Sequence, residues 1–509
     1  MANFSFCVII YILRNRFVWF FTFYEENAKI SLGDCMEQND FKRKIYNELI
    51  KWNNDQDKVP LIVDGLKEVG KSYIVNKFAH EFYANVITYD FRHKKELRNI
   101  FEGNLDVDTI IEKSSPYFPH DNFVPYKTIL IFEEIGDCPL ARTSLKSFAI
   151  DKRFSVIATG SLLGVLNFRR KKKIDIPTGY EKIIQMTSMD FEEFLWANGL
   201  NEESITLLKK HVKEEKEIPQ ALAFYYKEML KRYVIVGGLP GSVLKFLKSN
   251  NYIDSRDYLK GLIQDYRTDF GRFINENNEE EIDYNLQAKL NRVFDSIPSQ
   301  LARESDTLKF KYSLIKKGGR ASEFEEPFDW LNKAGLVLRC FNAKAIEKPL
   351  EANIDRTYFK AFISDIGLLM AMYPIQTSQS FLNESLDSRK GAIYENLCAT
   401  MINKCDFPLC YFSNGQEHLE IDFLIEDSEG IILLEEKSIN GKMAASKNVM
   451  EGKTSYKAKK CYKIIKENFG EGSFFTSIPQ YAAPFLLEQI KEECNKGMVL
   501  KPLEYPKEL

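Results

Sequence analysis

The sequence predicts an α/β protein of several domains. Short apolar segments rich in β-branched residues alternate with longer segments in which apolar residues recur every three or four positions, a pattern typical of a parallel sheet flanked by helices. The chain has 509 residues, which is enough for three to four domains of roughly 150 residues each. Because 44% of the residues are hydrophobic and 28% are charged, the composition excludes a largely disordered, collagen-like or polytopic membrane protein.

Charge and cysteine usage narrow the functional classes. The 70 Lys and Arg residues against 73 Asp and Glu residues give a net charge of −3, so any contact with DNA or RNA must be made by local basic segments. The nine cysteines are scattered and never spaced C-x-x-C, and the five histidines show no H-x-x-H spacing. This pattern favours reduced thiols in a cytoplasmic protein and argues against a zinc ribbon, a disulfide scaffold or a histidine metal site.

The first 35 residues are expected to be an extension that lies outside the fold. Residues 4–24 are apolar and aromatic, but Arg14 and Arg16 lie near their middle, where each charge costs about 2.5 to 3.5 kcal/mol in hydrocarbon. No small-residue cleavage site follows, as a signal peptide would require. We therefore expect translation to start at Met36, and we do not expect membrane attachment.

The first candidate site is a phosphate-binding loop. An apolar strand expected at 59–64 leads into Gly65-Leu66-Lys67-Glu68-Val69-Gly70-Lys71-Ser72, and a helix-period segment follows through Phe82. This segment matches G-x-x-x-x-G-K-[ST] at every fixed position, and strand, loop and helix are the context that the motif needs. A chance glycine-rich turn is the alternative, and the flanking elements argue against it.

Each fixed position of this loop has a chemical reason. Gly65 and Gly70 allow backbone N–H groups to point at phosphates, and the helix N-terminus adds its positive dipole end. Lys71 is expected to reach the β- and γ-phosphates of ATP, and the Ser72 hydroxyl is expected to complete Mg²⁺ coordination. The N–H groups between the glycines belong to Leu66, Lys67, Glu68 and Val69.

A second strand supplies the acids that such a loop requires. Residues 127–132 (KTILIF) predict a buried strand that ends in Glu133-Glu134. Glu133 is expected to hold Mg²⁺ through water, and Glu134 is expected to polarise the attacking water. Aspartate is usual at the first position, and glutamate is one methylene longer, so hydrolysis is expected to be slow or lost.

A third strand, 154–158, ends in Thr159-Gly160-Ser161. A hydroxyl there either senses the γ-phosphate or caps a helix that begins at Leu162, and the sequence leaves both interpretations open. The basic run 169–173 (RRKKK) beyond it is either a solvated loop or a contact to phosphates, including those of a neighbouring subunit.

The sequence pattern in the middle of the chain predicts helices. Apolar stripes cover 202–248 and 255–294, interrupted by a tight turn at 237–240 (GGLP) that lacks the Lys-Ser of a second nucleotide loop. Residues 294–340 predict three helices and a hairpin. This segment also holds five basic residues, which could bind nucleic acid only if they share a face, and acidic residues follow them directly. The basic residues are Lys309, Lys311, Lys316, Lys317 and Arg320.

The second candidate site is a hairpin that carries acids. Residues 420–425 and 431–437 predict two strands joined by a turn. Glu435 and Lys437 share one face, and Asp422 can lie opposite them on the partner strand. Two carboxylates and a lysine are the minimum for holding Mg²⁺ and orienting a water for phosphodiester cleavage. A lysine-rich helix expected within 442–463 would grip the phosphate backbone, although a neutral, self-complementary surface has the same charge pattern.

Several of these segments together resemble a known family. The stretches GLKEVGKS, ILIFEEIGDCP, TSLKSF, ATGSLLGV, MDFEEFL and IVGGLPGSV, spread over about residues 40 to 440, resemble the prokaryotic AAA-type ATP-binding proteins with a C-terminal nuclease-like domain of unknown function. The resemblance implies an AAA-type parallel sheet, a winged-helix-like middle domain and a restriction-endonuclease-like domain. The pattern D-x(12)-E-x-K is similar to that of the PD-(D/E)xK nucleases, and Glu395 matches their first acidic position.

The expected domains follow in order along the chain. They are an N-terminal extension at 1–35, a P-loop AAA-type core at 36–200, a helical extension at 201–285, a winged-helix-like domain at 286–375 and a nuclease-like domain at 376–509.

Two functions remain open at this level. The first is an ATP-hydrolysing protein whose nucleotide state controls a nuclease-like domain that acts on nucleic acid, with Ser72, Glu133, Asp422 and Glu435 as metal ligands. Its catalytic residues would be Glu134, Asp422, Glu435, Lys437 and Glu395. The alternative is a non-hydrolysing, ATP-gated interaction or signalling protein with a degenerate nuclease-like domain. Both functions leave open whether the chain binds a partner protein or a second copy of itself.

Overall fold

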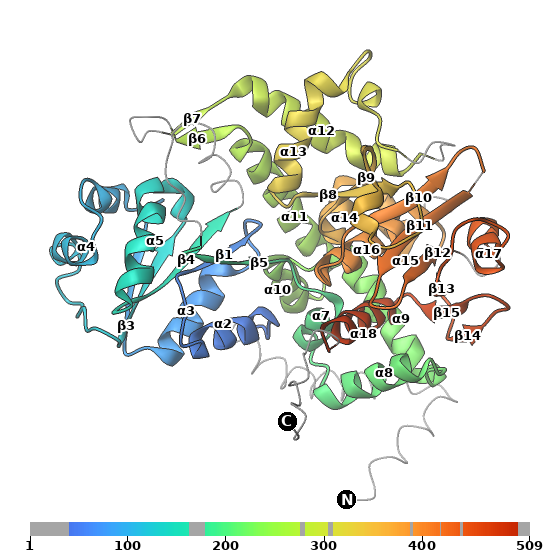
Figure 1. The fold of residues 1–509 in the computed structure, drawn as a ribbon, viewed down its shortest axis with the longest axis horizontal. Helices are drawn as coiled ribbons and strands as arrows, with labels where there is room; N and C mark the ends of the chain where they lie inside the picture. The colour runs from blue at the N-terminus through green and yellow to red at the C-terminus, as the bar shows by residue number, and fades with distance from the viewer. Residues whose placement is uncertain are drawn as a thin grey trace, which may run out of the picture.

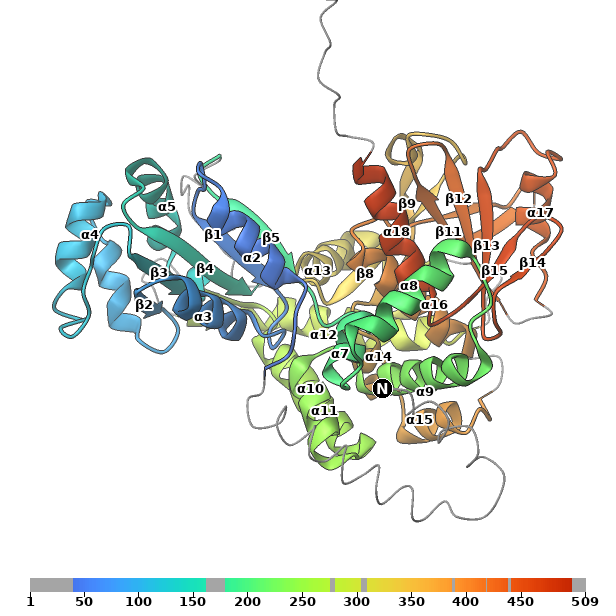
Figure 2. The same ribbon diagram turned by 90° about the horizontal axis from the view of Figure 1, so that it is seen from below.

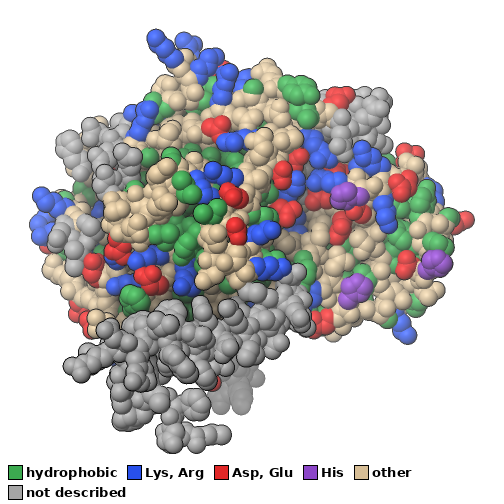
Figure 3. All heavy atoms as spheres, turned by 180° about the vertical axis from the view of Figure 1, so that it is seen from behind, with side chains coloured by type: hydrophobic (Ala, Val, Ile, Leu, Met, Phe, Trp, Pro, Cys, Tyr) green, Lys and Arg blue, Asp and Glu red, His purple; other side chains and the backbone are tan. Residues whose placement is uncertain are grey.

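The computed structural model describes residues 40–161, 179–274, 280–303, 309–386, 390–417, 419–437 and 441–496. The expected N-terminal extension and the basic run 169–173 lie outside these described residues. Among the described residues, no helix is long and apolar enough to cross a membrane. On the face shown in Figure 3, basic and acidic side chains are interspersed, which agrees with the near-zero net charge.

The N-terminal region is built on a five-stranded sheet with the order β2-β3-β4-β1-β5. All of its strand pairs are parallel, as the alternation of strands and helices predicts. Three of the strands match the predicted segments, whereas β2 and β5 were not predicted. The strands are β1 (Leu61–Gly65), β2 (Asn85–Asp90), β3 (Thr128–Glu133), β4 (Ser155–Ser161) and β5 (Lys182–Met186).

Helices cover both faces of this sheet (Figures 1 and 2). Leu61 and Val63 of β1 pack in the same apolar cluster as α2 (Ile45–Asn54) and α3 (Lys71–Phe82). The residue between them, Ile62, packs on the other face with the 3₁₀ helix η2, α4 and α5. Both faces are buried, which explains why the strand reads as a continuous apolar run. The elements of the second face are η2 (Lys95–Phe101), α4 (Val107–Ser114) and α5 (Pro139–Asp151).

A group of helices lies between the two sheets (Figure 2). The expected helical stretch 255–294 is interrupted by a short antiparallel hairpin of β6 and β7, which begins directly after Gly271 at φ +73°. The elements in order are α7 (Phe191–Ala197), α8 (Glu202–Glu214), α9 (Gln220–Val236), α10 (Pro240–Ser249), α11 (Tyr252–Asp269), β6 (Arg272–Ile274), β7 (Glu280–Ile282), α12 (Tyr284–Leu301), η4 (Tyr312–Leu314), α13 (Ala321–Lys333), α14 (Ile366–Met372) and α15 (Ile375–Leu382).

The C-terminal region is built on an eight-stranded mixed sheet, β14-β15-β13-β12-β11-β10-β8-β9. Of the hairpin expected within 294–340, only β8 begins inside these bounds; its antiparallel partner β9 follows at Ile354–Ile363, and β8 also pairs in parallel with β10. The expected boundary at 375 therefore crosses a continuous sheet, because the open edge of β8 is satisfied by a strand from beyond it. The strands are β8 (Val337–Ala343), β9 (Ile354–Ile363), β10 (Cys410–Asn414), β11 (Leu419–Glu426), β12 (Ile431–Glu436), β13 (Lys460–Ile465), β14 (Gly470–Glu471) and β15 (Thr476–Pro479).

Three helices complete this region: α16 (Lys390–Lys404), α17 (Ala444–Met450) and α18 (Ala483–Lys496). The lysine-rich helix expected within 442–463 is limited to the short α17, because Gly452 at φ +70° ends it and β13 begins at Lys460.

The turn at Gly237-Gly238 joins the regions. A Cβ atom on Gly238 would lie 2.0 Å from the Met189 carbonyl oxygen, so only glycine fits this close approach. Asp365, at the start of α14, is fully buried, and its Oδ2 atom accepts hydrogen bonds from Ser188 Oγ at 2.7 Å and Gly238 N at 2.9 Å. Segments from three parts of the chain are therefore fixed to one another at this turn.

Candidate functional site

The loop between β1 and α3 has the backbone that its sequence predicts. Gly70, directly before α3, has φ +95°, a left-handed conformation that favours glycine. A Cβ atom on Gly65 would lie 2.1 Å from the carbonyl oxygen of Met186 on the neighbouring strand β5. Gly65 thus allows β1 and β5 to approach closely, and Gly70 allows the turn into α3.

The Lys71 side chain lies within this loop. It is buried, and its Nζ atom donates to the carbonyl oxygens of Gly65 at 3.0 Å and Leu66 at 2.7 Å. Burial lowers the pKa of Lys71, and the neighbouring charges of Glu134 and Asp64 oppose this shift. Both hydrogen-bond partners are neutral carbonyls, so an anion can take their place.

The structure brings Ser72 and Glu133 together at the carboxyl end of β3. The Ser72 side chain hydrogen-bonds to the Glu133 carboxylate, and Asn76 Nδ2 donates to Glu133 Oε1 at 3.1 Å. Burial raises the pKa of Glu133, although these two hydrogen bonds oppose the rise. A hydroxyl and a carboxylate are oxygen ligands of the kind that Mg²⁺ prefers, so this pair fits the ion that the loop implies.

Glu134 is held by an arginine that the sequence did not single out. Its Oε2 atom lies 3.0 Å from Arg92 Nη2, and Arg92 Nε donates to Asp137 Oδ2 at 3.0 Å. Thr159 is buried at the end of β4, and its Oγ1 atom accepts from the Glu134 backbone N–H at 3.4 Å. Thr159 therefore contacts the acidic strand end; residue 162, the alternative helix start, lies outside the described residues.

Asp64 is a second residue that sequence reasoning missed. It ends the buried part of β1 directly before the loop, and its Oδ1 atom accepts from Gly65 N at 2.7 Å. Burial raises the pKa of Asp64 to about 6. The available signal was an aspartate at the end of an otherwise apolar strand.

Helix α11 covers the phosphate-binding loop. The Tyr266 hydroxyl donates to the carbonyl oxygen of Lys67 at 2.9 Å, and Lys67 Nζ lies 3.1 Å from Asp269 Oδ2. From the N-terminal side, Arg43 Nη1 donates to the Val69 carbonyl oxygen at 2.9 Å. The loop is thus bonded directly to the helices that separate the two sheets.

The predicted C-terminal acids also converge. Phe423 of β11 pairs with Leu434 of β12, so the ladder leads to Asp422 and Glu435 on adjacent strands. Asp422 Oδ2 accepts from Lys437 Nζ at 2.5 Å and from Glu436 N at 2.9 Å. Lys437 Nζ also lies 3.2 Å from Glu435 Oε2. We call Asp422, Glu435, Lys437 and Glu395, with its partner Lys360, the acidic cluster.

Within this cluster Glu435 is buried and bonded to Ser446. Burial, with the nearby charge of Asp422, raises the pKa of Glu435 to about 7. Burial alone lowers the pKa of Lys437, but the two carboxylates together raise it. Glu435 Oε2 is buried beside the Lys437 ammonium group, so a divalent cation there would take the place of that group. Among the described residues, no group of three or more His, Cys, Asp and Glu could hold a metal ion.

Glu395 is compensated by a lysine that the sequence did not indicate. Lys360 of β9 is buried, and its Nζ atom lies 2.5 Å from Glu395 Oε1. Burial lowers the pKa of Lys360, but the charges of Glu395 and Asp422 raise it above its ordinary value. The only signal was a lysine in the apolar second half of β9, and its partner comes from α16.

Several lysines of the two lysine-rich segments, 309–320 and 442–463, have nearby partners. Lys459 is paired with Asp427 at 2.6 Å, and Lys453 is paired with Glu451 at 2.5 Å. In the earlier segment, Lys316 lies 3.4 Å from Glu323, and Lys309 lies over the ring of Tyr358. These lysines are engaged by local acids or aromatic rings.

One family model matches the region that holds the first of these sites. A model described as an AAA domain matches residues 57–195, the stretch that holds the loop, β3 and β4. Residues 57–195 form an AAA-type P-loop domain. Two further models match residues 227–379 and 390–481, and both are described as domains of unknown function. No curated protein shows significant similarity to the chain.

Solved structures resemble the AAA-type domain and its neighbours only distantly. The Walker-type ATPase PABY2304 of Pyrococcus abyssi is 14% identical with a TM-score of 0.38, over 65% of this chain and 96% of that one. The ORC2 protein of Aeropyrum pernix is 10% identical with a TM-score of 0.33, over 72% and 94%. The RuvB Holliday junction branch migration motor of Thermotoga maritima is 13% identical with a TM-score of 0.23, over 62% and 89%. Similarities of this size do not establish a shared function.

Proposed function

We propose that the AAA-type domain binds ATP with Mg²⁺ and hydrolyses it, and that its nucleotide state controls the acidic cluster of the C-terminal sheet. The observation that carries the first part is the contact of Ser72 with Glu133 beside a buried Lys71. A hydroxyl, a carboxylate and a lysine at one loop are the groups that nucleotide phosphates and their metal ion require.

Each residue of the loop has a role in this proposal. Lys71 leaves the carbonyl oxygens of Gly65 and Leu66 and binds the β- and γ-phosphates. Ser72 and Glu133 would hold Mg²⁺, which would supply positive charge at the phosphates. Glu134 orients the attacking water. Arg92 pairs with the Glu134 carboxylate, and this pair opens before Glu134 contacts the water.

The control step rests on the contacts of the loop with the middle helices. Tyr266 and Asp269 of α11 bond to the loop at Lys67. A change in the conformation of the loop around a γ-phosphate therefore moves Lys67 and, with it, α11. Helix α11 packs with α14, which begins at Asp365, and Asp365 is bonded to the Gly237-Gly238 turn. A continuous packed path therefore leads from the nucleotide to the C-terminal region.

The second part of the proposal concerns the acidic cluster. Asp422 and Glu435 would hold Mg²⁺ or Mn²⁺, which lowers the pKa of a bound water. Lys437 would place its positive charge at the reacting phosphate of a nucleic acid, and Glu395 would support the site. The convergence of these side chains from β11, β12 and α16 supports this assignment.

An alternative function is an ATP-gated interaction protein in which neither site turns over. Two observations favour it. Glu133 is one methylene longer than the usual aspartate, and Lys437 and Lys360 already neutralise the carboxylates of the cluster. In this case the same contacts would pass a nucleotide signal to a bound protein.

Steady-state hydrolysis separates the two functions. We expect wild-type protein to hydrolyse ATP with Mg²⁺ and the Glu134→Gln variant to bind ATP without turnover. Tight ATP binding with equal, background turnover in both proteins would support the alternative.

The nuclease assignment needs its own assay. We expect Mg²⁺-dependent cleavage of plasmid or single-stranded DNA by wild-type protein and none by Asp422→Ala. Equal cleavage by the two proteins would remove the assignment.

A further inference from the structure

Two backbone carbonyl groups of the phosphate-binding loop are held by side chains from other parts of the chain. The Lys67 carbonyl oxygen accepts from the Tyr266 hydroxyl of α11 at 2.9 Å, and the Val69 carbonyl oxygen accepts from Arg43 Nη1 at 2.9 Å. Both donor side chains are buried. They lie outside residues 57–195, so segments that precede and follow the AAA-type domain contact its loop.

Each of these carbonyls directly precedes a residue in the left-handed conformation. Glu68 has φ +67° and Gly70 has φ +95°. The φ angle of a residue is the rotation that relates it to the peptide plane before it, so a bond that fixes a carbonyl oxygen helps to fix the φ angle that follows. The left-handed conformation is unfavourable for Glu68, because its Cβ atom crowds the following carbonyl oxygen. The hydrogen bond from Tyr266 therefore holds a conformation that Glu68 would otherwise tend to leave.

The same two bonds orient two N–H groups of the loop. In a planar trans peptide the C=O and N–H bonds point in opposite directions. The Glu68 N–H therefore points away from α11, and the Gly70 N–H points away from Arg43. Among the described residues, no backbone carbonyl accepts a hydrogen bond from either N–H group. Successive N–H groups in such a turn form a concave surface that binds anions.

Both donors are themselves fixed in place. Burial raises the pKa of Tyr266 well above its ordinary value, so the hydroxyl keeps the proton that it donates. Arg43 Nη2 donates to the Thr187 carbonyl oxygen at 2.6 Å, and Arg43 Nε lies 3.2 Å from Glu193 Oε2. The guanidinium group is thus held on two sides while its third nitrogen reaches the loop.

The segment that carries Arg43 is also bonded to the C-terminal region. The next residue, Lys44, has its Nζ atom 2.6 Å from Asp190 Oδ2 and is paired with Glu488 of α18. Helix α18 packs with α16, the helix that carries Glu395 of the acidic cluster. A displacement of the C-terminal helices can therefore be passed on to the residue next to Arg43.

From these contacts we propose that Tyr266 and Arg43 are positioning residues for nucleotide binding. By holding two carbonyls on the outside of the loop, they keep the N–H groups of Glu68 and Gly70 aimed at the phosphates of ATP. The proposal rests on the proposed binding of ATP by this loop. It adds that residues outside the AAA-type domain order the loop for phosphate, so the affinity for ATP depends on how α11 and the Arg43 segment are docked.

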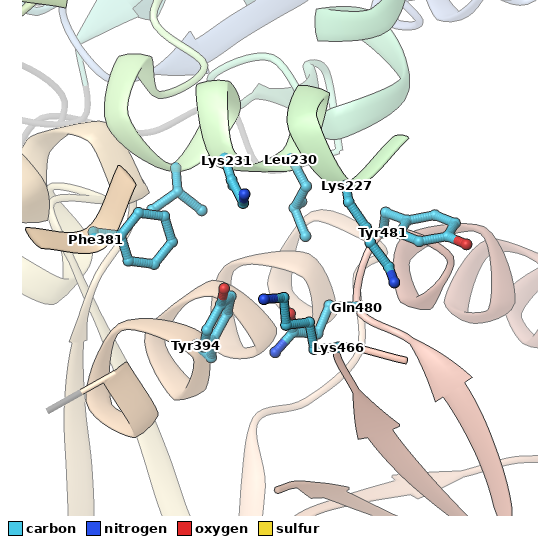
Figure 4. A pocket seen from close by; sticks show the side chains of 9 residues that line it. Lys227, Leu230, Lys231, Phe381, Tyr394, Lys466, Gln480 and Tyr481 are labelled. Carbon is cyan, nitrogen blue, oxygen red and sulfur yellow. The ribbon is translucent and has the colours of Figure 1, made fainter. Parts of the chain in front are cut away.

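Titration calorimetry with ATP and Mg²⁺ on the full-length protein tests the role of Tyr266. Tyr266→Phe removes only the hydroxyl, and we expect about fivefold weaker binding, since a net contribution of this order is typical of one hydrogen bond. The matched control is Tyr226→Phe in α9. Tyr226 is also buried, its hydroxyl donates to the Ser204 carbonyl oxygen at 3.0 Å, and its ring stacks on Tyr481, which Figure 4 shows beside α9. The control loses the same kind of bond away from the loop and should bind ATP as wild type.

Arg43→Lys gives a second test. Lysine keeps the positive charge but lacks the planar fork with which arginine bonds to two carbonyl oxygens at once, so we expect about tenfold weaker binding of ATP. The control is Arg256→Lys, at a buried arginine of α11 whose Nη1 atom donates to the Met370 carbonyl oxygen at 2.7 Å. This control should keep the wild-type affinity.

Inorganic pyrophosphate separates positioning from a general loss of structure. It has phosphates without a base or a ribose, so its affinity for Tyr266→Phe should fall by the same factor as that of ATP. The melting temperature without nucleotide should fall by similar amounts in Tyr266→Phe and Tyr226→Phe, because each loses one buried hydrogen bond. A loss for ATP without a loss for pyrophosphate, or an equal loss of ATP affinity in Tyr226→Phe, would overturn the proposal.

Lys71→Ala, measured in the same titration, separates this proposal from the proposed function. If Lys71→Ala loses ATP binding while Tyr266→Phe and Arg43→Lys bind as wild type, the loop is the nucleotide site and only the positioning role is overturned. If Lys71→Ala binds ATP as wild type does, the proposed function fails and the positioning role fails with it. Should Arg43→Lys fail to fold, the result for Tyr266→Phe decides.

Discussion

The phosphate-binding loop and the acidic cluster are made of the same residue types but differ in how their charges are satisfied. In the loop, Lys71 bonds only to neutral carbonyl oxygens, and the Glu133 carboxylate bonds to Ser72 and Asn76. In the cluster, Lys437 pairs with Asp422 and Glu435. The loop thus has a cation ready for an incoming anion, whereas the cluster is already neutralised. This difference predicts that nucleotide binds readily and that chemistry at the cluster needs a rearrangement.

The largest effect is expected at the turn that links the two regions. Gly238→Ala would place a methyl group 2.0 Å from the Met189 carbonyl oxygen, so we expect a loss of about 3 kcal/mol or more in the free energy of unfolding. Thermal and denaturant unfolding measure it. The matched control is Gly261→Ala in α11, where a Cβ atom meets nothing within 4 Å and a gain of about 0.5 to 1 kcal/mol is expected. Equal stability of the two variants would show that the turn does not hold the regions together.

The next effect tests whether Lys71 is available to an anion. Lys71→Ala should weaken binding of ATP with Mg²⁺ by about 100-fold, because a hydrogen bond to a charged group contributes about 1.5 to 3 kcal/mol. Titration calorimetry measures the affinity. Lys77→Ala in the same helix, where the lysine pairs with Asp40 at the surface, should bind as wild type. If Lys71→Ala bound ATP normally, the loop would not be the nucleotide site.

A pH profile tests the neutralised state of the cluster. The pKa of Glu435 is about 7 when folded, against an ordinary 4.5, so the folded state binds more protons between these values. The free energy of unfolding therefore falls as the pH rises through this window, and Glu435→Gln should flatten that fall. Denaturant unfolding at several pH values measures it. The control is Glu203→Gln, at an exposed acid of α8, which should keep the wild-type slope. A Glu435→Gln profile as steep as that of the control would contradict the burial of the Glu435 carboxylate.

The smallest effect concerns the length of Glu133. Glu133→Asp restores the shorter acid usual at this position, so we expect a few-fold rise in the rate of ATP hydrolysis, under about 1 kcal/mol in activation free energy. Steady-state phosphate release measures it, with Glu134→Gln as the inactive reference. A slower Glu133→Asp variant would indicate that the bonds from Ser72 and Asn76 have adapted the site to glutamate.

The sequence predicted the parts of the fold whose pattern is local. Strands β1, β3 and β4 are buried on both faces and read as unbroken apolar runs, so they were found. Strand β5, at the edge of the sheet, has exposed residues between its apolar ones and was missed. A hairpin was expected within 294–340, but only β8 begins there, and β9 lies beyond it. The place of β8 in the C-terminal sheet depends on pairing with β10, a contact between residues far apart in the sequence.

The site residues, like the strands, were predicted where the sequence pattern is local. Lys71 and Ser72 belong to one short pattern, and Asp422 lies on a predicted hairpin with Glu435, so spacing fixes their proximity. Glu133 was found at the end of an apolar strand, and the sheet brings that strand end to the loop. Lys360 of β9 and Arg92, in the turn after β2, complete the two sites, and only tertiary packing brings them to Glu395 and Glu134. The only local signal for Lys360 was its place in the apolar second half of β9.

Hydrogen exchange with and without ATP and Mg²⁺ tests the central claim, that the nucleotide state of the AAA-type domain reaches the acidic cluster. The account predicts that ATP changes amide protection in the loop, in α11, at the Gly237-Gly238 turn and in the strands β11 and β12, and that Lys71→Ala abolishes all of these changes. Changes confined to residues 57–195, with β11 and β12 unaffected, would contradict it.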